Sequence, residues 1–193
     1  MPPILSTEDL IKRVRDYYDS SNAFLFTPEP TPEEARRQAL WSKWIEDMQA
    51  WKDFRAALRS ELPDYMTGET YSSADGGPRC VIYPPQDSRT PSSNWLVVGC
   101  VSLLAPVYFV YGAECDSSEE GGFRNMKASF EPPPPNMRSP AQVIARTIET
   151  SFGFSAVSRE VAETPVPLFA GRLKPPETTL FHTLFTSAPS SIP

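Results

Sequence analysis

Nucleophilic catalysis by a serine or cysteine would have to use His182 as its base, because this is the only histidine in the 193-residue chain. Such mechanisms need a base within reach of the hydroxyl or thiol. His182 lies in the apolar run 180–184, a context that a half-buried structural histidine also explains. The chain has no G-x-S-x-G elbow, P-loop or G-x-G-x-x-G motif. The sequence therefore predicts no catalytic residue of this class.

The three cysteines, Cys80, Cys100 and Cys115, form no C-x-x-C pair. With one histidine, a two- or three-histidine metal site cannot form within a single chain, and zinc would need cysteine ligands. We therefore expect no cofactor and no metal. The odd number of cysteines argues against a secreted disulfide framework, and the first residues carry no basic region of the kind that opens a signal peptide. The sequence thus predicts a cytoplasmic protein.

Carboxylates are the remaining candidates for catalysis. The chain has 24 aspartates and glutamates, and among so many acids some pair can meet across a cleft, as glycosidase chemistry requires. Their spacing in the sequence selects no particular pair. An uncharacterised enzyme that uses paired carboxylates in a cleft therefore stays open as an alternative function.

Four acids crowd the segment 114–120, directly after the most apolar stretch of the chain. They are Glu114, Asp116, Glu119 and Glu120, and no basic residue follows before position 124. Their spacing does not match a calcium-binding loop. An acidic loop could dock against a basic partner, because opposed charge speeds encounter and suppresses wrong partners. The alternative is a solvated loop without a partner. We take these four residues as the candidate partner-binding site.

The net charge of the chain is −6, from 18 basic and 24 acidic residues. The basic residues are scattered as singles and pairs, without the cluster that nucleic-acid binding requires. We therefore expect no nucleic-acid partner. An acidic protein favours basic partners if its partners are charged at all.

The elements that would position these residues can be located from the 22 prolines, because proline interrupts helix interiors and sheet centres. Thr31-Pro32-Glu33-Glu34 has a hydroxyl, a proline and an acid in the order that starts a helix. Runs of helices and strands without strict alternation predict a single α+β domain over residues 1–193. Its antiparallel sheet of about four strands would pack against a long N-terminal helix and the C-terminal helices. Helices are expected at about 7–20, 32–62, 140–152 and 177–186, and strands at about 79–84, 95–102, 107–113 and 126–131.

Residues 95–113 contain no charge, and two interpretations compete for them. A transmembrane helix needs about 20 apolar residues, a length that this run nearly reaches. Pro106 near its middle, the many valines and tyrosines, and the acids that follow it favour a buried β-hairpin that turns around residues 103–106. We expect the hairpin and no membrane association, with a membrane-associated protein as the alternative.

Three tryptophans, Trp41, Trp44 and Trp51, recur at helical spacing within the expected helix 32–62. Tryptophan often anchors protein–protein interfaces. An apolar stripe at helical spacing is more often the side of a helix that faces the core. We therefore expect these residues in the core, with one of them exposed at an edge as the alternative.

The C-terminal two-thirds of the chain has a recognisable order of elements. The strand pair NWLVVGCVSLLAPVYFVYGAE is followed by SPAQVIARTIETSFGF, a Pro-Val-Pro segment and the closing TLFHTLF. In this order, residues 94–186 resemble the immunity proteins of bacterial polymorphic toxin systems. The resemblance lies in the pattern of elements and carries no functional residue across. It implies a non-enzymatic cytoplasmic inhibitor that binds one cognate protein toxin and occludes its active site. The acidic charge fits such a role if the toxin is a basic, nuclease-like protein.

Overall fold

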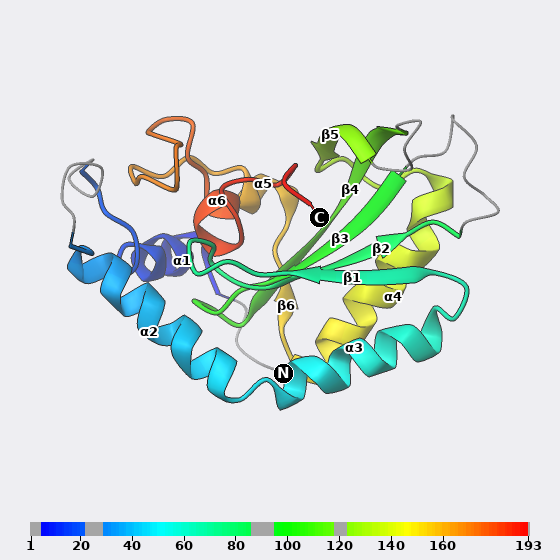
Figure 1. The fold of residues 1–193 in the computed structure, drawn as a ribbon. Helices are drawn as coiled ribbons and strands as arrows, with labels where there is room; N and C mark the ends of the chain where they lie inside the picture. The colour runs from blue at the N-terminus through cyan, green and yellow to red at the C-terminus, as the bar shows by residue number, and fades with distance from the viewer. Residues whose placement is uncertain (1–4, 22–28, 86–94, 118–122, 193) are drawn as a thin grey trace.

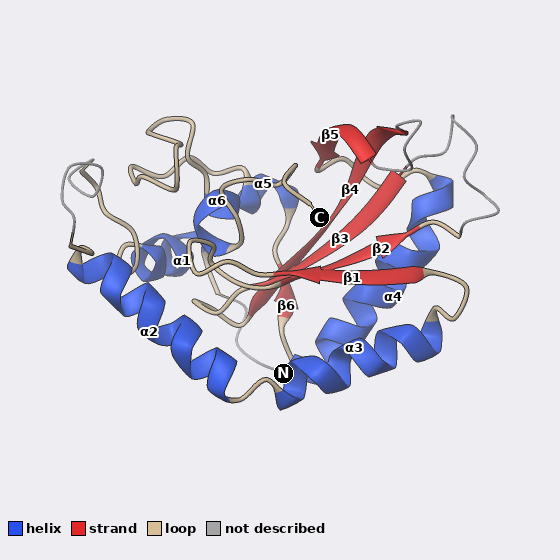
Figure 2. Ribbon diagram, in the orientation of Figure 1, coloured by secondary structure: helices blue, strands red, loops and turns tan. Residues whose placement is uncertain are grey.

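The computed structural model describes residues 5–21, 29–85, 95–117 and 123–192. A six-stranded sheet forms its centre, with β1 to β5 hydrogen-bonded side by side in chain order (Figures 1 and 2). Neighbouring strands are antiparallel, except that β6 pairs in parallel with the start of β4. The α+β class is therefore confirmed, with six strands in place of about four. The strands are β1 Met66–Thr70, β2 Arg79–Tyr83, β3 Trp95–Val101, β4 Val107–Ser117, β5 Phe123–Ser129 and β6 Ser155–Ala156.

Helices cover both faces of this sheet (Figure 1). Those in the described residues are α1 Thr7–Val14, α2 Pro32–Glu46, α3 Gln49–Glu61, α4 Pro135–Phe152, α5 Arg159–Ala162 and α6 Leu180–Leu184. α3 and α4 cover one face, where Phe54 and Ile144 belong to one buried cluster. α1 and α6 cover the other face, where Leu10 and Phe181 belong to a second cluster. α2 runs along the outside from the end of α1 to the start of α3 (Figure 1).

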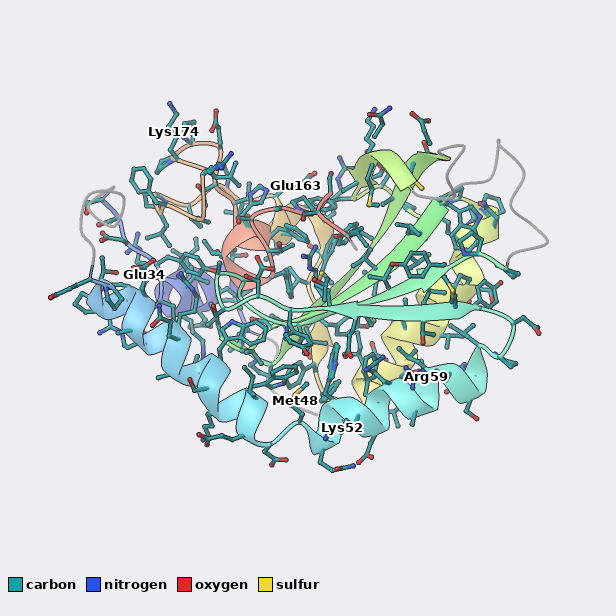
Figure 3. The ribbon with its side chains drawn as sticks, viewed as in Figure 1. Glu34, Met48, Lys52, Arg59, Glu163 and Lys174 are labelled. Atoms are coloured by element: carbon teal, nitrogen blue, oxygen red, sulfur yellow. The ribbon has the colours of Figure 1, made fainter. Side chains whose placement is uncertain are left out.

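The expected helix 32–62 is wrong, because the chain leaves helical geometry at Asp47. This residue has φ −129° and ψ 77°, and its side-chain Oδ1 accepts a hydrogen bond from the N–H two residues on, at 3.4 Å. Met48 lies at the junction of the two shorter helices, α2 and α3 (Figure 3). The bend lets α2 follow α1 while α3 lies beside α4, so that Trp41 and Trp51 are both buried.

Three other helices exist with different boundaries. The helix expected at 7–20 ends at Val14, after which the chain turns. The one expected at 140–152 begins at Pro135, because a proline is tolerated at N1, and Pro140 therefore lies inside α4 and donates no hydrogen bond there. The one expected at 177–186 is the short helix α6.

The apolar residues 95–113 form the expected hairpin of β3 and β4, with Trp95 opposite Glu114 and Val101 opposite Tyr108. Within the described ranges, no helix is long and apolar enough to span a bilayer. β2 and β3 match the strands expected at 79–84 and 95–102 to within one residue.

The remaining strands depart from the prediction. β4 extends beyond the expected 107–113 because β5 pairs with its second half, and β5 itself begins before the expected 126–131. β1 was not predicted, since Gly68 and Glu69 have low strand propensity. β6 has two residues, too few for an alternating pattern.

Candidate functional site

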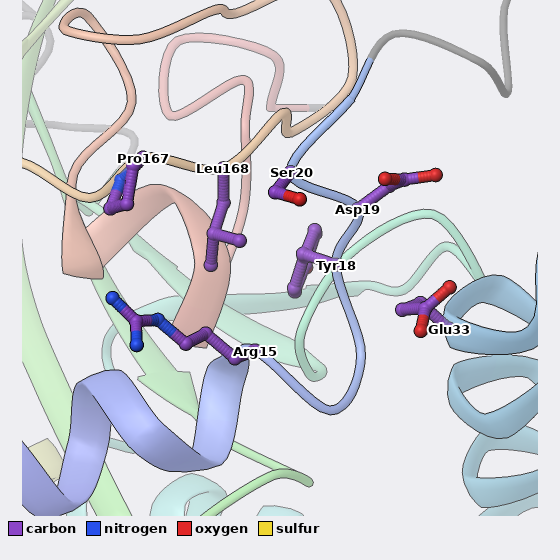
Figure 4. Close-up of a pocket in the computed structure, with 7 residues that line it drawn as sticks. All are labelled: Arg15, Tyr18, Asp19, Ser20, Glu33, Pro167 and Leu168. Carbon is purple, nitrogen blue, oxygen red and sulfur yellow. The ribbon is translucent and has the colours of Figure 1, made fainter.

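A groove lies between the end of α1, the start of α2 and the segment 165–171. Its two parts share Tyr18 and Asp19, and we call the whole the α1–α2 groove. The larger part has a volume of about 520 Å³ and is lined by Arg15, Tyr18, Asp19, Ser20, Glu33, Pro167 and Leu168 (Figure 4). The smaller part, of about 230 Å³, is lined by Tyr18, Asp19, Glu34, Arg37, Ala74, Phe169 and Gly171.

The backbone carbonyls of Asp16, Tyr17 and Asp19 accept hydrogen bonds that join the walls of this groove. The chain turns after Val14, so these carbonyls are free to accept hydrogen bonds from outside α1. The bonds that they accept come from Arg36 Nε to Asp16 at 2.6 Å, from Arg37 Nη1 to Tyr17 at 2.8 Å and from the Phe169 N–H to Asp19 at 2.9 Å. The end of α1 is thus bonded both to α2 and to the segment 165–171, and the groove is preformed.

Arg37 forms the buried part of the groove wall. Its guanidinium Cζ lies 4.5 Å from the centroid of the Tyr18 ring, within the range of a cation–π interaction. Its Nη2 atom lies 3.9 Å from a carboxylate oxygen of Glu34. Burial raises the pKa of the Tyr18 hydroxyl to about 12. This end of the groove therefore combines a fixed cation with a phenol that stays protonated at neutral pH.

Three carboxylates line the groove, and each has a partner within the chain. Asp19 Oδ1 accepts the Ser21 N–H at 2.8 Å, Glu33 pairs with Arg36 at 2.8 Å, and Glu34 Oε2 accepts the Thr31 N–H at 3.2 Å. Arg15 lies on the side of Pro167 and Leu168, away from Glu33 (Figure 4). The groove therefore has an acidic side and a basic side.

The segment 165–171 has no regular secondary structure, but isolated β-bridges hold it in place. Single β-bridges join Pro165 to Thr179 and Ala170 to Leu173. Gly171 has φ +58°, a left-handed conformation that glycine adopts without strain. The turn places Leu168 in the core and leaves Pro167 exposed at the rim of the groove.

Further into the protein, a buried ion pair joins Asp75 and Arg79 at 3.6 Å, with side-chain exposures of 8% and 4%. Burial raises the pKa of Asp75, against the lowering effects of Arg79 and of hydrogen bonds from Thr186 and Ser187. The Arg79 Nη1 atom donates to the Ala188 carbonyl at 3.4 Å. This cluster attaches the C-terminal segment to β2 and does not line the groove.

Two of the four acids predicted to bind a partner lie elsewhere, at the β4–β5 end of the sheet. Glu114 and Asp116 are exposed, but they belong to β4 and not to a loop, because β5 pairs with this part of the strand. The register places Lys127 opposite Glu114 and Arg124 opposite Asp116, with a bulge between the two pairs. Each of these two acids therefore has a basic residue opposite it on the neighbouring strand. Glu119 and Glu120 lie outside the described residues.

The residues considered for nucleophilic chemistry, His182 and the three cysteines, have structural roles in the fold. His182 is the N3 residue of α6, and its Nδ1 accepts the Thr179 N–H at 3.1 Å. Burial lowers the pKa of His182. The three thiols are buried, and burial raises the pKa of each, that of Cys80 to about 12. A thiol with a raised pKa is a poor nucleophile at neutral pH.

The tryptophan stripe is mainly core. Trp41 and Trp51 are buried, whereas Trp44 is partly exposed between them, with ring centroids 5.2 Å and 5.9 Å from theirs. Tyr71, 47% exposed, lies 5.8 Å from Trp44. An aromatic cluster thus reaches the surface beside the start of β2 and the bend between α2 and α3.

The sequence did not indicate the α1–α2 groove. Its residues come from four separate segments, at 15–20, 33–37, 74 and 167–171, and hydrogen bonds to backbone carbonyls, which every residue has, join them. Comparison with known proteins gave no match to a family model, to a curated protein or to a solved structure. The site is therefore interpreted from its own geometry.

Proposed function

We propose that the chain is a protein-binding module without enzymatic activity, which acts as an immunity protein that binds and occludes a cognate bacterial toxin. The α1–α2 groove carries the proposal. It is concave, its walls are joined by hydrogen bonds, and its carboxylates are held in place. A preorganised surface loses little conformational entropy when a partner binds. The order of elements in residues 94–186 suggests the toxin as the class of partner.

A protruding partner segment with a basic side chain fits this groove best. Asp19 and Glu33 offer carboxylate oxygens on one side, and Pro167 offers exposed apolar surface on the other. A lysine or arginine side chain matches both sides, because its charged head can face the carboxylates while its apolar stem lies against the apolar surface. The net charge of −6 adds a long-range attraction for a basic protein.

Carboxylate catalysis has less support than binding. A catalytic carboxylic acid usually has a pKa raised by burial or by a second acid. Burial raises the pKa of Asp75 in this way. It pairs with Arg79 and lines neither part of the groove.

We retain the four acids Glu114, Asp116, Glu119 and Glu120 as a second contact with the toxin, and the first two of them lie at the end of β4. Lys127 stands opposite Glu114 in the ladder, so the local field is weaker than four acids alone would give. Charges at the rim of an interface mainly affect the association rate. We therefore assign this end a role in encounter and the groove a role in affinity.

The product of the gene next to this one is the partner to test. It is expressed alone and together with the chain, and cell growth and complex formation on gel filtration are measured. We expect growth arrest alone, restored growth on co-expression and a stable complex. A neighbouring product that is harmless and does not bind would contradict the immunity function.

Charge reversal then tests the groove. In the complex, Asp19→Lys with Glu33→Lys should raise the dissociation constant by about tenfold or more. The matched control is Glu46→Lys with Asp64→Lys, two exposed acids outside the groove, which should leave the dissociation constant unchanged. Equal effects of the two double variants would mean that net charge, and not the groove, governs binding.

A further inference from the structure

The strand β1 has a free edge. It lies at one end of the strand order and pairs with β2 over all five residues. In the described part of the chain, no backbone group outside the sheet hydrogen-bonds to residues 66–70. Because an antiparallel pair uses the backbone groups of alternate residues, the other groups of β1 point away from β2.

This edge has no proline, lysine or bulge, and its one charged residue, Glu69, is paired with Arg55 of α3. Natural edge strands are protected by short length, charged side chains such as lysine, proline, a bulge or a covering element. β1 has the sequence Met-Thr-Gly-Glu-Thr, and its register with β2 has no bulge. Three large apolar side chains are strongly exposed in the described residues. Two of them are at β1: Met66, its first residue, is 50% exposed, and Tyr71, the residue after it, is 47% exposed.

The sequence of β1 complements itself in the antiparallel direction. A two-fold axis through Gly68 sets Met66 opposite Thr70 of a second copy, and Thr67 opposite Glu69. All five residues then pair, and no like charges stand opposite each other. An axis through Glu69 would instead set that carboxylate opposite its own copy. One residue beyond the strand, Tyr71 reaches the level of Tyr65 in the second copy.

Side chains from α3 add charge complementarity to this arrangement. Arg59 Nε donates to Thr67 Oγ1 at 3.2 Å, and Arg59 lies on α3, next to β1 (Figure 3). Glu69 accepts from Trp51 Nε1 at 2.7 Å and pairs with Arg55, on the same face of the sheet. With Thr67 opposite Glu69 of the second copy, the Arg59 guanidinium comes close to that carboxylate, and the contact occurs twice by symmetry.

We propose that two copies of this chain associate through β1, which joins their sheets into one continuous antiparallel sheet about a two-fold axis at Gly68. The interface is distinct from the α1–α2 groove and does not depend on the proposed toxin binding. It covers the free backbone groups of β1 and the exposed Met66 and Tyr71 together.

Sedimentation equilibrium of the purified full chain over a wide concentration range tests the association. We expect the mass to rise from 21.5 kDa to twice that value with concentration. Amide hydrogen exchange in β1 should slow as the dimer forms. A chain that stays monomeric at every concentration, or a dimer without added protection in β1, overturns the proposal.

A matched pair of variants at Thr67 tests the register. Thr67→Glu sets two carboxylates opposite each other at both symmetric positions, whereas Thr67→Lys sets opposite charges there. The dissociation constants of the two variants should differ by about tenfold or more, with the lysine variant tighter. Urea unfolding of each variant at monomeric concentration shows whether the fold itself has changed. Two folded variants with equal dissociation constants exclude this register and overturn the proposal.

Discussion

The N–H of Phe169 donates a hydrogen bond to the carbonyl of Asp19 at 2.9 Å, and this bond joins the C-terminal half of the chain to the end of α1. Together with the bonds from Arg36 and Arg37 to the neighbouring carbonyls, it fixes the walls of the α1–α2 groove. The groove is therefore a property of the folded chain before any partner arrives. Rigid placement of charged and apolar surface suits recognition, and this relationship is the basis of the proposed function.

Arg37 and Arg36 are adjacent arginines with different burial, and we expect different costs when each is replaced. Arg37→Met removes a charged hydrogen bond to the Tyr17 carbonyl and the contact with the Tyr18 ring, both in a buried setting. It should lower the free energy of unfolding by about 2 to 3 kcal/mol. Arg36→Met removes exposed contacts and should cost at most about 1 kcal/mol. Urea unfolding measures both, and equal losses would contradict the role given to Arg37.

The buried acid Asp75 should make stability depend on pH in an unusual direction. Burial raises its pKa above the ordinary value of 3.8, so the folded state binds the proton more tightly than the unfolded state does. This contribution to stability is full below pH 3.8 and is lost as the pH rises through the raised pKa.

The variant Asp75→Asn tests this sign, because it keeps the shape of the protonated acid without the charge. The free energy of unfolding of the variant should not decrease in this way as the pH rises. At about pH 7 it should equal or exceed the wild-type value. A loss of several kcal/mol in the variant at that pH would mean that the attraction of Arg79 outweighs the cost of burial.

His182 should give a pH dependence of opposite sign. Burial lowers its pKa below 6.5, so the folded state binds a proton less readily than the unfolded state. Its contribution to stability is present above pH 6.5 and is lost as the pH falls through the lowered pKa. Protonation also removes the acceptor that receives the Thr179 N–H.

The variant His182→Gln keeps an acceptor at this helix position without a titrating group. Its melting temperature should fall less than that of the wild type between about pH 7.5 and about pH 5. Because the chain has one histidine, the imidazole titration can be followed by a single NMR signal. A pKa of 6.5 or above in the folded protein would refute the assignment.

Local chemistry explains which elements were predictable. The start of α2 follows from Thr31, Pro32 and Glu34, whose capping interactions involve neighbours in sequence. The break at Asp47 follows from the need to bury Trp41 and Trp51 against different parts of the structure, and no local residue requires it. A pattern of neighbours in sequence therefore marks a helix start better than a bend that tertiary packing imposes.

The hairpin of residues 95–113 and the groove show the same contrast. Pro106 and the β-branched residues point to a turn between strands from local preferences alone. The groove depends on bonds from Arg37 and Phe169 to backbone carbonyls distant in sequence, and backbone carbonyls carry no sequence signal. The acidic segment was visible, but its pairing with Lys127 depends on the β4–β5 register, which the sequence did not specify.

Alanine substitutions at Gly77 and Gly153 distinguish the cost of steric crowding from the cost of backbone strain. A Cβ on Gly77 would lie 1.8 Å from the Val101 carbonyl oxygen, so Gly77→Ala forces the backbone to move and should cost about 3 kcal/mol or more. Gly153 ends α4 with φ +69°, and beyond its own neighbours in the chain no atom lies within 4 Å of the position that a Cβ would take. Gly153→Ala should therefore cost only the strain of the left-handed conformation, about 1 kcal/mol. Chemical denaturation compares them, and the reverse order would contradict the close packing at Gly77.

The most direct test of the central claim is the affinity of the chain for the product of the neighbouring gene, measured by isothermal titration for the wild type and for the double variant Asp19→Lys with Glu33→Lys. The account predicts a stable complex with the wild type and a dissociation constant raised by about tenfold or more in the variant. The control Glu46→Lys with Asp64→Lys should bind like the wild type. An unchanged dissociation constant in a folded groove variant would contradict the claim that the α1–α2 groove binds the partner.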